Sequence, residues 1–170
     1  QQLARQCVLD GLHYDPGPLD LRAEVLGREE LMPRLDDPDY SMGWGLHDDS
    51  LFGLALEELA ALEEGERPYL LTVLTIGTHH PDGHVADSCA PLPDSDDSML
   101  QAIYCSDQLI SGFIDRVSEM TDPDETLIVV FSDHLAMRNT LWDTLQEHKD
   151  RRRLTWFVLD GGAPVVDDQP

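Results

Sequence analysis

The chain has 170 residues, of which 34 are acidic and 11 are basic, so its formal net charge is −23 at pH 7. Such a field repels nucleic acid and anionic membrane surfaces and excludes both as nonspecific partners. The hydrophobic content of 41% is that of a soluble globular domain with its own core, and no apolar run approaches the roughly 20 residues that cross a bilayer.

The first forty residues are the least regular part of the chain. Segments 15–18 and 36–39 are rich in Asp, Pro and Gly and are typical of turns, and Leu21–Leu35 can hold a short helix. The chain begins at Gln1 without an initiator Met or a signal pattern, so we expect a processed chain or a fragment of a longer one.

Three apolar runs predict buried strands, because a strand of a parallel sheet reads as a short continuous apolar segment. Helical spacing of apolar residues separates these runs. Their alternation predicts a three-layer α/β/α fold with a mainly parallel sheet and right-handed crossovers. The predicted strands are Tyr69–Ile76, Thr126–Ser132 and Leu154–Leu159, and the predicted helices are Leu51–Leu62, Met99–Met120 and Leu141–His148.

Two acidic segments precede the longer helices and supply candidate N-caps. Asp48–Ser50 lies before the first helix and Asp97 before the second. We expect Ile103 and Val117 on the inner face of the second helix. Trp44, between two glycines, is expected to be a core anchor, with packing over a site as the alternative.

The three cysteines lack the spacing of a zinc motif. A disulfide between Cys89 and Cys105 fits an oxidising compartment and would leave Cys7 over. Three independent thiols are an equal alternative.

An Asp–His pair follows the second predicted strand. Asp133 and His134 offer a carboxylate oxygen and an imidazole nitrogen just beyond the strand's carboxyl end, where α/β folds bind ligands. This donor pair suits a divalent metal. A capping Asp beside a surface His is the alternative interpretation.

The loop after the first strand carries three histidines, His79, His80 and His84. A His beside a dianionic ester can donate hydrogen bonds or protonate a leaving group, whereas the alternative is a solvated His-rich loop. Arg138 and Asn139 could contact substrate oxygens or cap the following helix.

Three motifs in order, Trp44–Phe52, Leu74–His84 and Phe131–Thr140, resemble the phosphoglycerol transferases of the alkaline phosphatase/sulfatase superfamily. The string SDHLAM-x-NT is most similar to the phosphoglycerol transferase I family and more distantly to lipoteichoic acid synthases. The resemblance runs from Gly27 to Leu159, while residues 1–26 match poorly. We therefore interpret residues 1–170 as one partial sulfatase-like catalytic domain, truncated at its N-terminus.

The resemblance implies an enzyme anchored in the inner membrane, with its catalytic domain on the periplasmic or extracytoplasmic face. Such enzymes transfer phosphoglycerol from phosphatidylglycerol to a glycan and use a divalent metal, commonly Mn²⁺, with Zn²⁺ or Mg²⁺ as alternatives. Asp133 and His134 would be metal ligands and His79 would contact the phosphoglycerol group. His80, Arg138 and Asn139 are further substrate-binding candidates.

The family's Thr nucleophile and its remaining acidic ligand are expected upstream of this chain. We therefore expect the chain alone to bind metal weakly and to have little activity, so strong single-turnover labelling by a phosphatidylglycerol analogue would contradict the interpretation. A sulfatase or phosphoesterase of the same superfamily and a non-catalytic binding module remain alternatives. An open sheet edge with apolar surface could support a homodimer.

Overall fold

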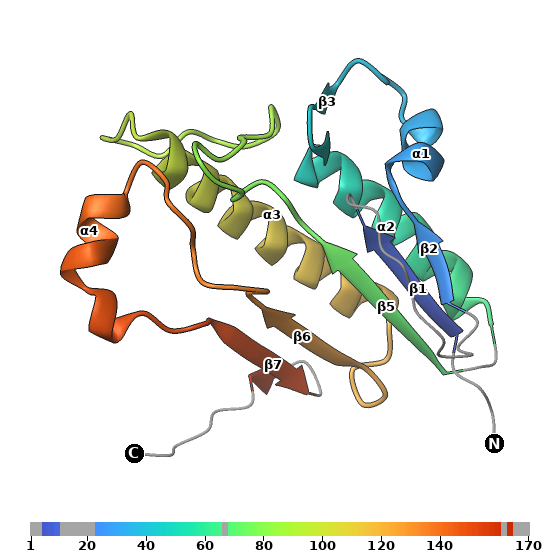
Figure 1. Cartoon of the computed structure of the whole chain (residues 1–170). Helices are drawn as coiled ribbons and strands as arrows, with labels where there is room; N and C mark the ends of the chain where they lie inside the picture. The colour runs from blue at the N-terminus through green and yellow to red at the C-terminus, as the bar shows by residue number, and fades with distance from the viewer. Residues whose placement is uncertain (1–4, 11–22, 66–67, 161–162, 165–170) are drawn as a thin grey trace.

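The computed structural model describes residues 5–10, 23–65, 68–160 and 163–164. Two long helices lie side by side, one of them packs on a small parallel sheet, and a second small sheet follows at the other end of the chain (Figure 1). Within the described ranges, no helix is long and apolar enough to cross a membrane. The elements are β1 (Arg5–Asp10), β2 (Ala23–Leu26), α1 (Arg28–Leu31), η1 (Met32–Arg34), β3 (Ser41–Met42), β4 (Gly45–Leu46), α2 (Asp48–Glu63), β5 (Tyr69–Leu74), α3 (Ser98–Met120), β6 (Leu127–Phe131), α4 (Trp142–Glu147), η2 (Lys149–Arg151), β7 (Trp156–Asp160) and β8 (Ala163–Pro164).

The first sheet has the strand order β2-β1-β5, and all its strands are parallel. In the centre of the sheet Val8 lies opposite Val25 on one side and Thr72 on the other. The predicted strand at Tyr69–Ile76 is confirmed as β5. Strands β1 and β2 were not predicted, because each has an apolar run of only two or three residues.

The second sheet is antiparallel, so the prediction of one mainly parallel sheet is wrong. Strands β6 and β7 confirm the two predicted apolar runs, but they pair in opposite directions. Residues 132–155 join the two strands and return to the end at which β6 stopped, because Phe131, the last residue of β6, lies opposite Trp156, the first residue of β7.

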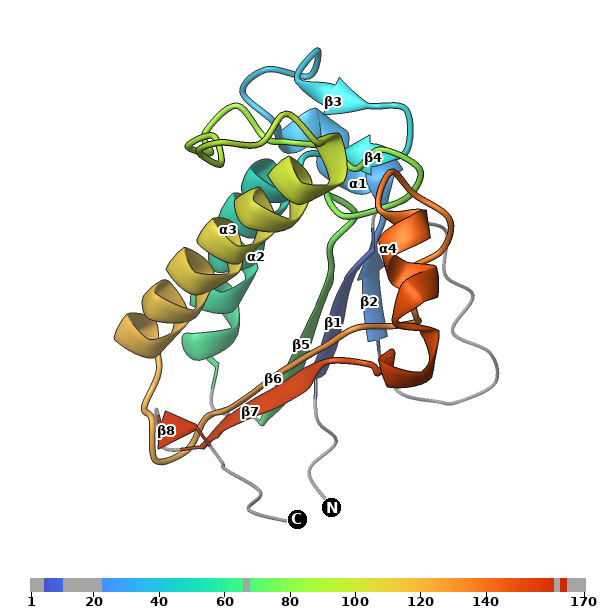
Figure 2. The ribbon, with the colours of Figure 1, turned by 90° about the vertical axis from the view of Figure 1, so that its left-hand side faces the viewer.

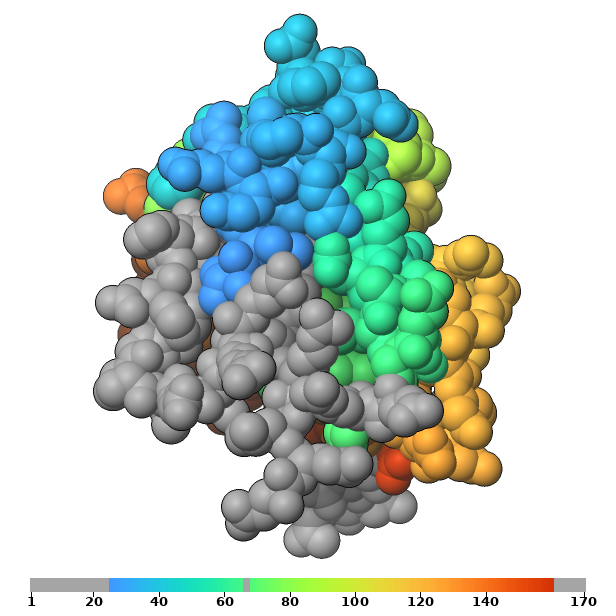
Figure 3. All heavy atoms as spheres, turned by 90° about the vertical axis from the view of Figure 1, so that its right-hand side faces the viewer, coloured from blue at the N-terminus to red at the C-terminus, as the bar shows by residue number. Residues whose placement is uncertain are grey.

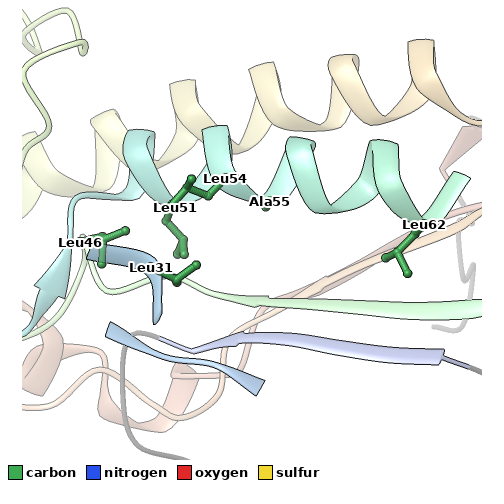
Figure 4. Close-up of a cluster of buried hydrophobic side chains, with 6 residues drawn as sticks. All are labelled: Leu31, Leu46, Leu51, Leu54, Ala55 and Leu62. Atoms are coloured by element: carbon green, nitrogen blue, oxygen red, sulfur yellow. The ribbon is translucent and has the colours of Figure 1, made fainter. Parts of the chain in front are cut away.

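Helix α2 forms the centre of the main core. Its leucines recur at helical spacing, and Leu51, Leu54 and Ala55 are buried against Leu31 and Leu46 of the preceding segment (Figure 4). The N-cap is His47, so the predicted cap within Asp48–Ser50 is wrong. Asp48 instead lies inside the first turn with its carboxylate buried.

Two ion pairs hold the segment before α2 against its outer surface. The Arg34 guanidinium lies 2.9 Å from the Glu57 carboxylate and 2.5 Å from that of Glu58. Figure 3 shows this side of the molecule, with the blue and cyan atoms that precede α2 resting on its teal atoms. Pairs this exposed contribute about 0–1 kcal/mol, so the core beneath supplies most of the attachment.

Helix α3 begins as predicted, because the Asp97 side chain accepts a hydrogen bond from the Leu100 amide at 3.0 Å. Its buried face differs from the expected one. Ile103 is 46% exposed, whereas Met99 and Ala102 are buried and Val117 is buried as expected. The ring of Phe113 stacks on Phe52 of α2 at 4.6 Å, which sets the side of α3 that turns inward.

The second sheet exposes an apolar strip, which we define as Leu127, Val129, Phe131 and Trp156. The register puts Phe131 opposite Trp156, so both rings stand on the same face. Leu127, Phe131 and Trp156 are each more than 60% exposed. The expectation that β6 and β7 are fully buried is therefore wrong for the described residues, although the strands themselves form.

The disulfide between Cys89 and Cys105 is present, with the two Cα atoms 5.3 Å apart. It joins the loop after β5 to the buried side of α3. We predict that Cys89→Ala lowers the free energy of unfolding by about 3 kcal/mol, because a cross-link over 16 residues restricts the unfolded chain. Urea denaturation of the variant and of the reduced parent protein measures the effect. Equal midpoints with and without reductant would contradict it.

Candidate functional site

The loops that follow β5 and β6 lie at the same end of the molecule, where both strands point (Figures 1 and 2). A hydrogen bond joins them: the Thr140 hydroxyl donates to the Asp97 carboxylate at 2.9 Å. Asp97 also caps α3, so one side chain fixes both the helix and the loop after β6. The candidate residues all lie on these loops and on the short β3–β4 hairpin.

Asp48 holds the end of β5 in place. Its carboxylate is 3% exposed and accepts hydrogen bonds from the backbone amides of Ile76, at 3.0 Å, and Gly77, at 3.0 and 3.1 Å. These amides lie just past the last residue of β5 and are buried. We call this arrangement the Asp48 clamp.

The loop of residues 76–84 then closes on itself through its own backbone. The His79 amide donates to the Ile76 carbonyl at 3.0 Å, and the Gly83 amide donates to the His79 carbonyl at 3.0 Å. Gly83 has a positive φ of 71°, and a Cβ there would lie 2.4 Å from that of Ala102. Only glycine fits, so α3 sets the return of the loop. We call residues 76–84 the His79 loop.

The imidazole of His79 is stacked between two rings. Its centroid lies 4.5 Å from that of Trp44 and 4.6 Å from that of His80. The Nδ1 atom lies 2.7 Å from the His80 carbonyl oxygen, which can only accept, so Nδ1 carries the proton. In the neutral ring Nε2 is therefore left with a lone pair for a donor such as a hydroxyl.

Trp44 is the residue that sequence reasoning placed wrongly. It is 49% exposed and packs over His79, so the expectation of a core anchor does not hold. The signal in the sequence is the pair of flanking glycines. They form a tight hairpin whose tip presents the indole rather than burying it.

His84 closes the loop on its inner side. Its amide donates to the Gly77 carbonyl at 2.6 Å. Burial lowers the pKa of the His84 imidazole, and the charges of His47 and His79 lower it further. His84 is therefore neutral around pH 7 and adds no positive charge beside His79.

Asp49, the next residue of α2, fastens two other loops. Its carboxylate accepts hydrogen bonds from the Tyr40 hydroxyl at 3.0 Å and from the Ser88 hydroxyl at 2.7 Å. The Tyr40 hydroxyl in turn accepts from the Asp87 amide at 2.7 Å, and burial raises the pKa of Tyr40 to about 12. The start of α2 therefore anchors the β3–β4 hairpin and both halves of the long β5–α3 loop.

Asp133 and His134 form an exposed pair directly after β6. The His134 Nδ1 atom lies 2.9 Å from the Leu135 carbonyl, so it carries the proton and leaves a lone pair on Nε2. That Nε2 atom lies 3.5 Å from Asp133 Oδ2. Two donor atoms bound at about 2.1 Å to one tetrahedral Zn²⁺ ion are separated by about this distance. An octahedral ion such as Mn²⁺ would need the two atoms to lie slightly closer together.

Asn139 and Arg138 have different settings. The Asn139 side-chain oxygen accepts from the Leu141 amide at 2.9 Å, and its carbonyl accepts from the Trp142 amide at 3.1 Å. Asn139 thus shapes the turn that leads into α4 but does not cap the helix, whose N-cap is Leu141 without a side-chain hydrogen bond. Arg138 is exposed beside it.

The structure brings the candidates together as two groups. His79 and His80 share one stack, and Asp133 and His134 form the other group. In the part of the chain that the structure describes, no three His, Cys, Asp or Glu side chains are grouped so that they could hold a metal. A single hollow shared by His79 and the Asp133–His134 pair therefore remains a prediction.

A family model described as Sulfatase matches residues 17–156. The chain belongs to the sulfatase family. It is 37% identical over 144 residues to phosphoglycerol transferase I of Salmonella arizonae, and 40% identical over 131 residues to that of Xanthomonas axonopodis pv. citri. These alignments cover 82% and 75% of the chain but only 19% and 18% of the relatives, so the chain spans about a fifth of their length.

Two solved structures show the same fold at low identity. One is a lipoteichoic acid synthase from Listeria monocytogenes, with a TM-score of 0.62, 13% identity, and coverage of 92% of this chain and 43% of that one. The other is an alkaline phosphatase superfamily protein from Vibrio parahaemolyticus, with a TM-score of 0.56, 18% identity, and coverage of 78% and 33%. The fold is thus of the alkaline phosphatase/sulfatase-like α/β type.

The Asp48 clamp of this sulfatase-family chain predicts a pH dependence of stability. Burial raises the pKa of the Asp48 carboxyl above its ordinary 3.8, and the two backbone amides only partly offset this. The folded state therefore holds the proton to higher pH than the unfolded chain does. The contribution of Asp48 to the free energy of unfolding should fall as pH rises from about 4 through the raised value.

Asp48→Asn removes this titration but keeps an oxygen that can accept from both amides. We expect the free energy of unfolding of Asp48→Asn, measured by urea denaturation, to rise relative to that of the parent between pH 4 and pH 7. A constant difference across that range would contradict the prediction.

Proposed function

We propose that this sulfatase-family chain is part of a catalytic domain that transfers phosphoglycerol from phosphatidylglycerol to a periplasmic or cell-envelope glycan. The observation that carries the proposal is the 36–40% identity to relatives named phosphoglycerol transferase I, over 75–82% of this chain. Since the chain spans about a fifth of those relatives, the whole activity is inferred from them.

Asp133 and His134 would supply two ligands to a divalent metal, with Mn²⁺ as the first candidate and Zn²⁺ or Mg²⁺ as alternatives. The support is the facing of Oδ2 and Nε2 at 3.5 Å, together with the bond from Nδ1–H to a carbonyl that orients metal-binding histidines. When bound, the metal would polarise a phosphoryl oxygen and offset negative charge. A chain of net charge −23 needs such a cation to attract an anionic headgroup.

The His79 loop would bind the phosphoglycerol headgroup. Nε2 of His79 is free to accept a hydrogen bond from a glycerol hydroxyl, because Nδ1 is engaged by the His80 carbonyl. The half-exposed indole of Trp44 gives this position an apolar wall. His80 and Arg138 are further candidates for contacts with the donor or the glycan, whereas Asn139 orients the turn that carries Arg138.

The extracytoplasmic face of the inner membrane is the proposed location of the whole protein. The Cys89–Cys105 disulfide supports it, because such bonds persist in oxidising compartments.

We also propose that the chain can form a homodimer through an open edge of its second sheet, where the apolar strip is exposed. Light scattering across a concentration series tests this, and a constant monomer mass would contradict it.

The metal assignment predicts that the chain binds Mn²⁺ through Asp133 and His134. Loss of free Mn²⁺ signal in electron paramagnetic resonance measures the affinity. We expect Asp133→Ala and His134→Ala each to weaken binding at least about tenfold. Asp143→Ala, an exposed carboxylate on α4, is the matched control and should bind as the parent does. Equal binding by all four proteins would remove the assignment.

The headgroup assignment predicts that glycerol phosphate, added with Mn²⁺, shifts the NMR signals of the Trp44 indole and the His79 ring. Asp133→Ala should reduce the response, since the metal would hold the phosphate. Inorganic sulfate is the comparison ligand. A response to sulfate but not to glycerol phosphate would favour a sulfatase, and a response to neither would favour a non-catalytic module.

A further inference from the structure

We propose that Asp48 is the positioning residue of the His79 loop and acts through a contact matched to Gly77. The inference rests on the proposed function only for the identity of the ligand that the loop binds. The contact between Asp48 and Gly77 does not depend on that function. Asp48 touches no candidate substrate position, and its carboxylate reaches only the backbone at the start of the loop. Its effect on His79 must therefore pass through that backbone.

Gly77 is required because the Asp48 carboxylate occupies the space of a side chain. A Cβ at residue 77 would lie 2.4 Å from Asp48 Oδ2, closer than nonbonded atoms approach, and it would also make tight contacts of 3.1 Å with Asp48 Cγ and 3.3 Å with the His84 carbonyl oxygen. Gly77 has no positive φ, so its backbone conformation does not by itself call for glycine. The glycine is explained by the carboxylate, and the two residues form one contact.

The contact is transmitted to His79 over a very short path. The clamped residues Ile76 and Gly77 each use their carbonyl to hold the far side of the loop, through the amides of His79 and His84. Asp48 therefore binds the amides of Ile76 and Gly77, while the carbonyls of the same two residues fix the conformation of the loop. A shift at residue 77 therefore moves the His79 ring relative to Trp44.

The indole of Trp44 is positioned from the same place. Trp44 lies in the hairpin that immediately precedes α2, and β4 is buried next to His47 and Asp48. The start of α2 consequently determines both partners of the Trp44–His79 stack. Other titratable groups around the clamp are His47, the N-cap of α2, Asp49 in the first turn of α2, and His84 in the loop.

A double-mutant cycle on the 170-residue chain tests the matched contact. The variants are Asp48→Ala, Gly77→Ala and the double variant, and the readouts are hydrogen exchange of the Ile76 and Gly77 amides and the Trp44–His79 proton contact in NMR. We expect each single change to speed exchange at least tenfold and to weaken the ring contact. Gly77→Ala should add less than about twofold in the Asp48→Ala background, where the methyl group no longer meets a carboxylate. Effects that simply multiply would overturn the proposal.

Two further variants separate positioning from general destabilisation. Asp48→Asn keeps an acceptor oxygen and should stay within about threefold of the parent exchange rate. Asp49→Asn, its neighbour, should disturb Tyr40 and Ser88 and leave the His79 loop unchanged. If Asp48→Ala instead speeds exchange equally through the core of α2, the residue is a general stability element and the proposal fails.

Glycerol phosphate binding distinguishes this proposal from the function it builds on. If the parent chain binds the ligand, Gly77→Ala should weaken binding at least about tenfold, and the Asp48→Ala background should reduce that effect. If the parent does not bind while the exchange pattern holds, the headgroup assignment is wrong and the positioning role stands. If binding is present and unchanged in Gly77→Ala, the positioning role is wrong.

Discussion

The buried carboxylate of Asp48 is the interaction on which the candidate site depends. It sits in the first turn of α2, where acidic residues usually interact with their own helix, but it is used on the backbone of another element. Without it, the first two amides of the His79 loop would be buried without partners, which costs about 1–3 kcal/mol for each group. Asp49 fastens the neighbouring loops, so one helical turn organises three segments distant in sequence.

Electrostatics sets the second constraint. The chain carries three acidic residues for each basic one, yet its proposed donor is an anion. The proposed resolution is the divalent cation that Asp133 and His134 would share, because it would offset the negative charge where the donor binds.

Much of the arrangement could be predicted from the sequence, and the exceptions have physical reasons. The strands β5, β6 and β7 could be predicted because each is a continuous apolar run, but such runs carry no information about strand direction or about which faces of a sheet are covered. The Asp–His pair and the His-rich loop were found because their chemistry lies within single motifs. The Asp48 clamp was missed because its partners are 28 and 29 residues away and are backbone amides, which no side-chain pattern reveals.

The exposed apolar strip on β6 and β7 makes the acidic surface important for keeping the chain in solution. At neutral pH a charge of −23 opposes association beyond the proposed homodimer by mutual repulsion, although each chain has large exposed rings. That protection disappears near the isoelectric point of about 4.2, where carboxylates are partly protonated. The solubility of this chain thus depends on the ionisation of its carboxylates. Near the isoelectric point, contacts between exposed apolar strips favour aggregation.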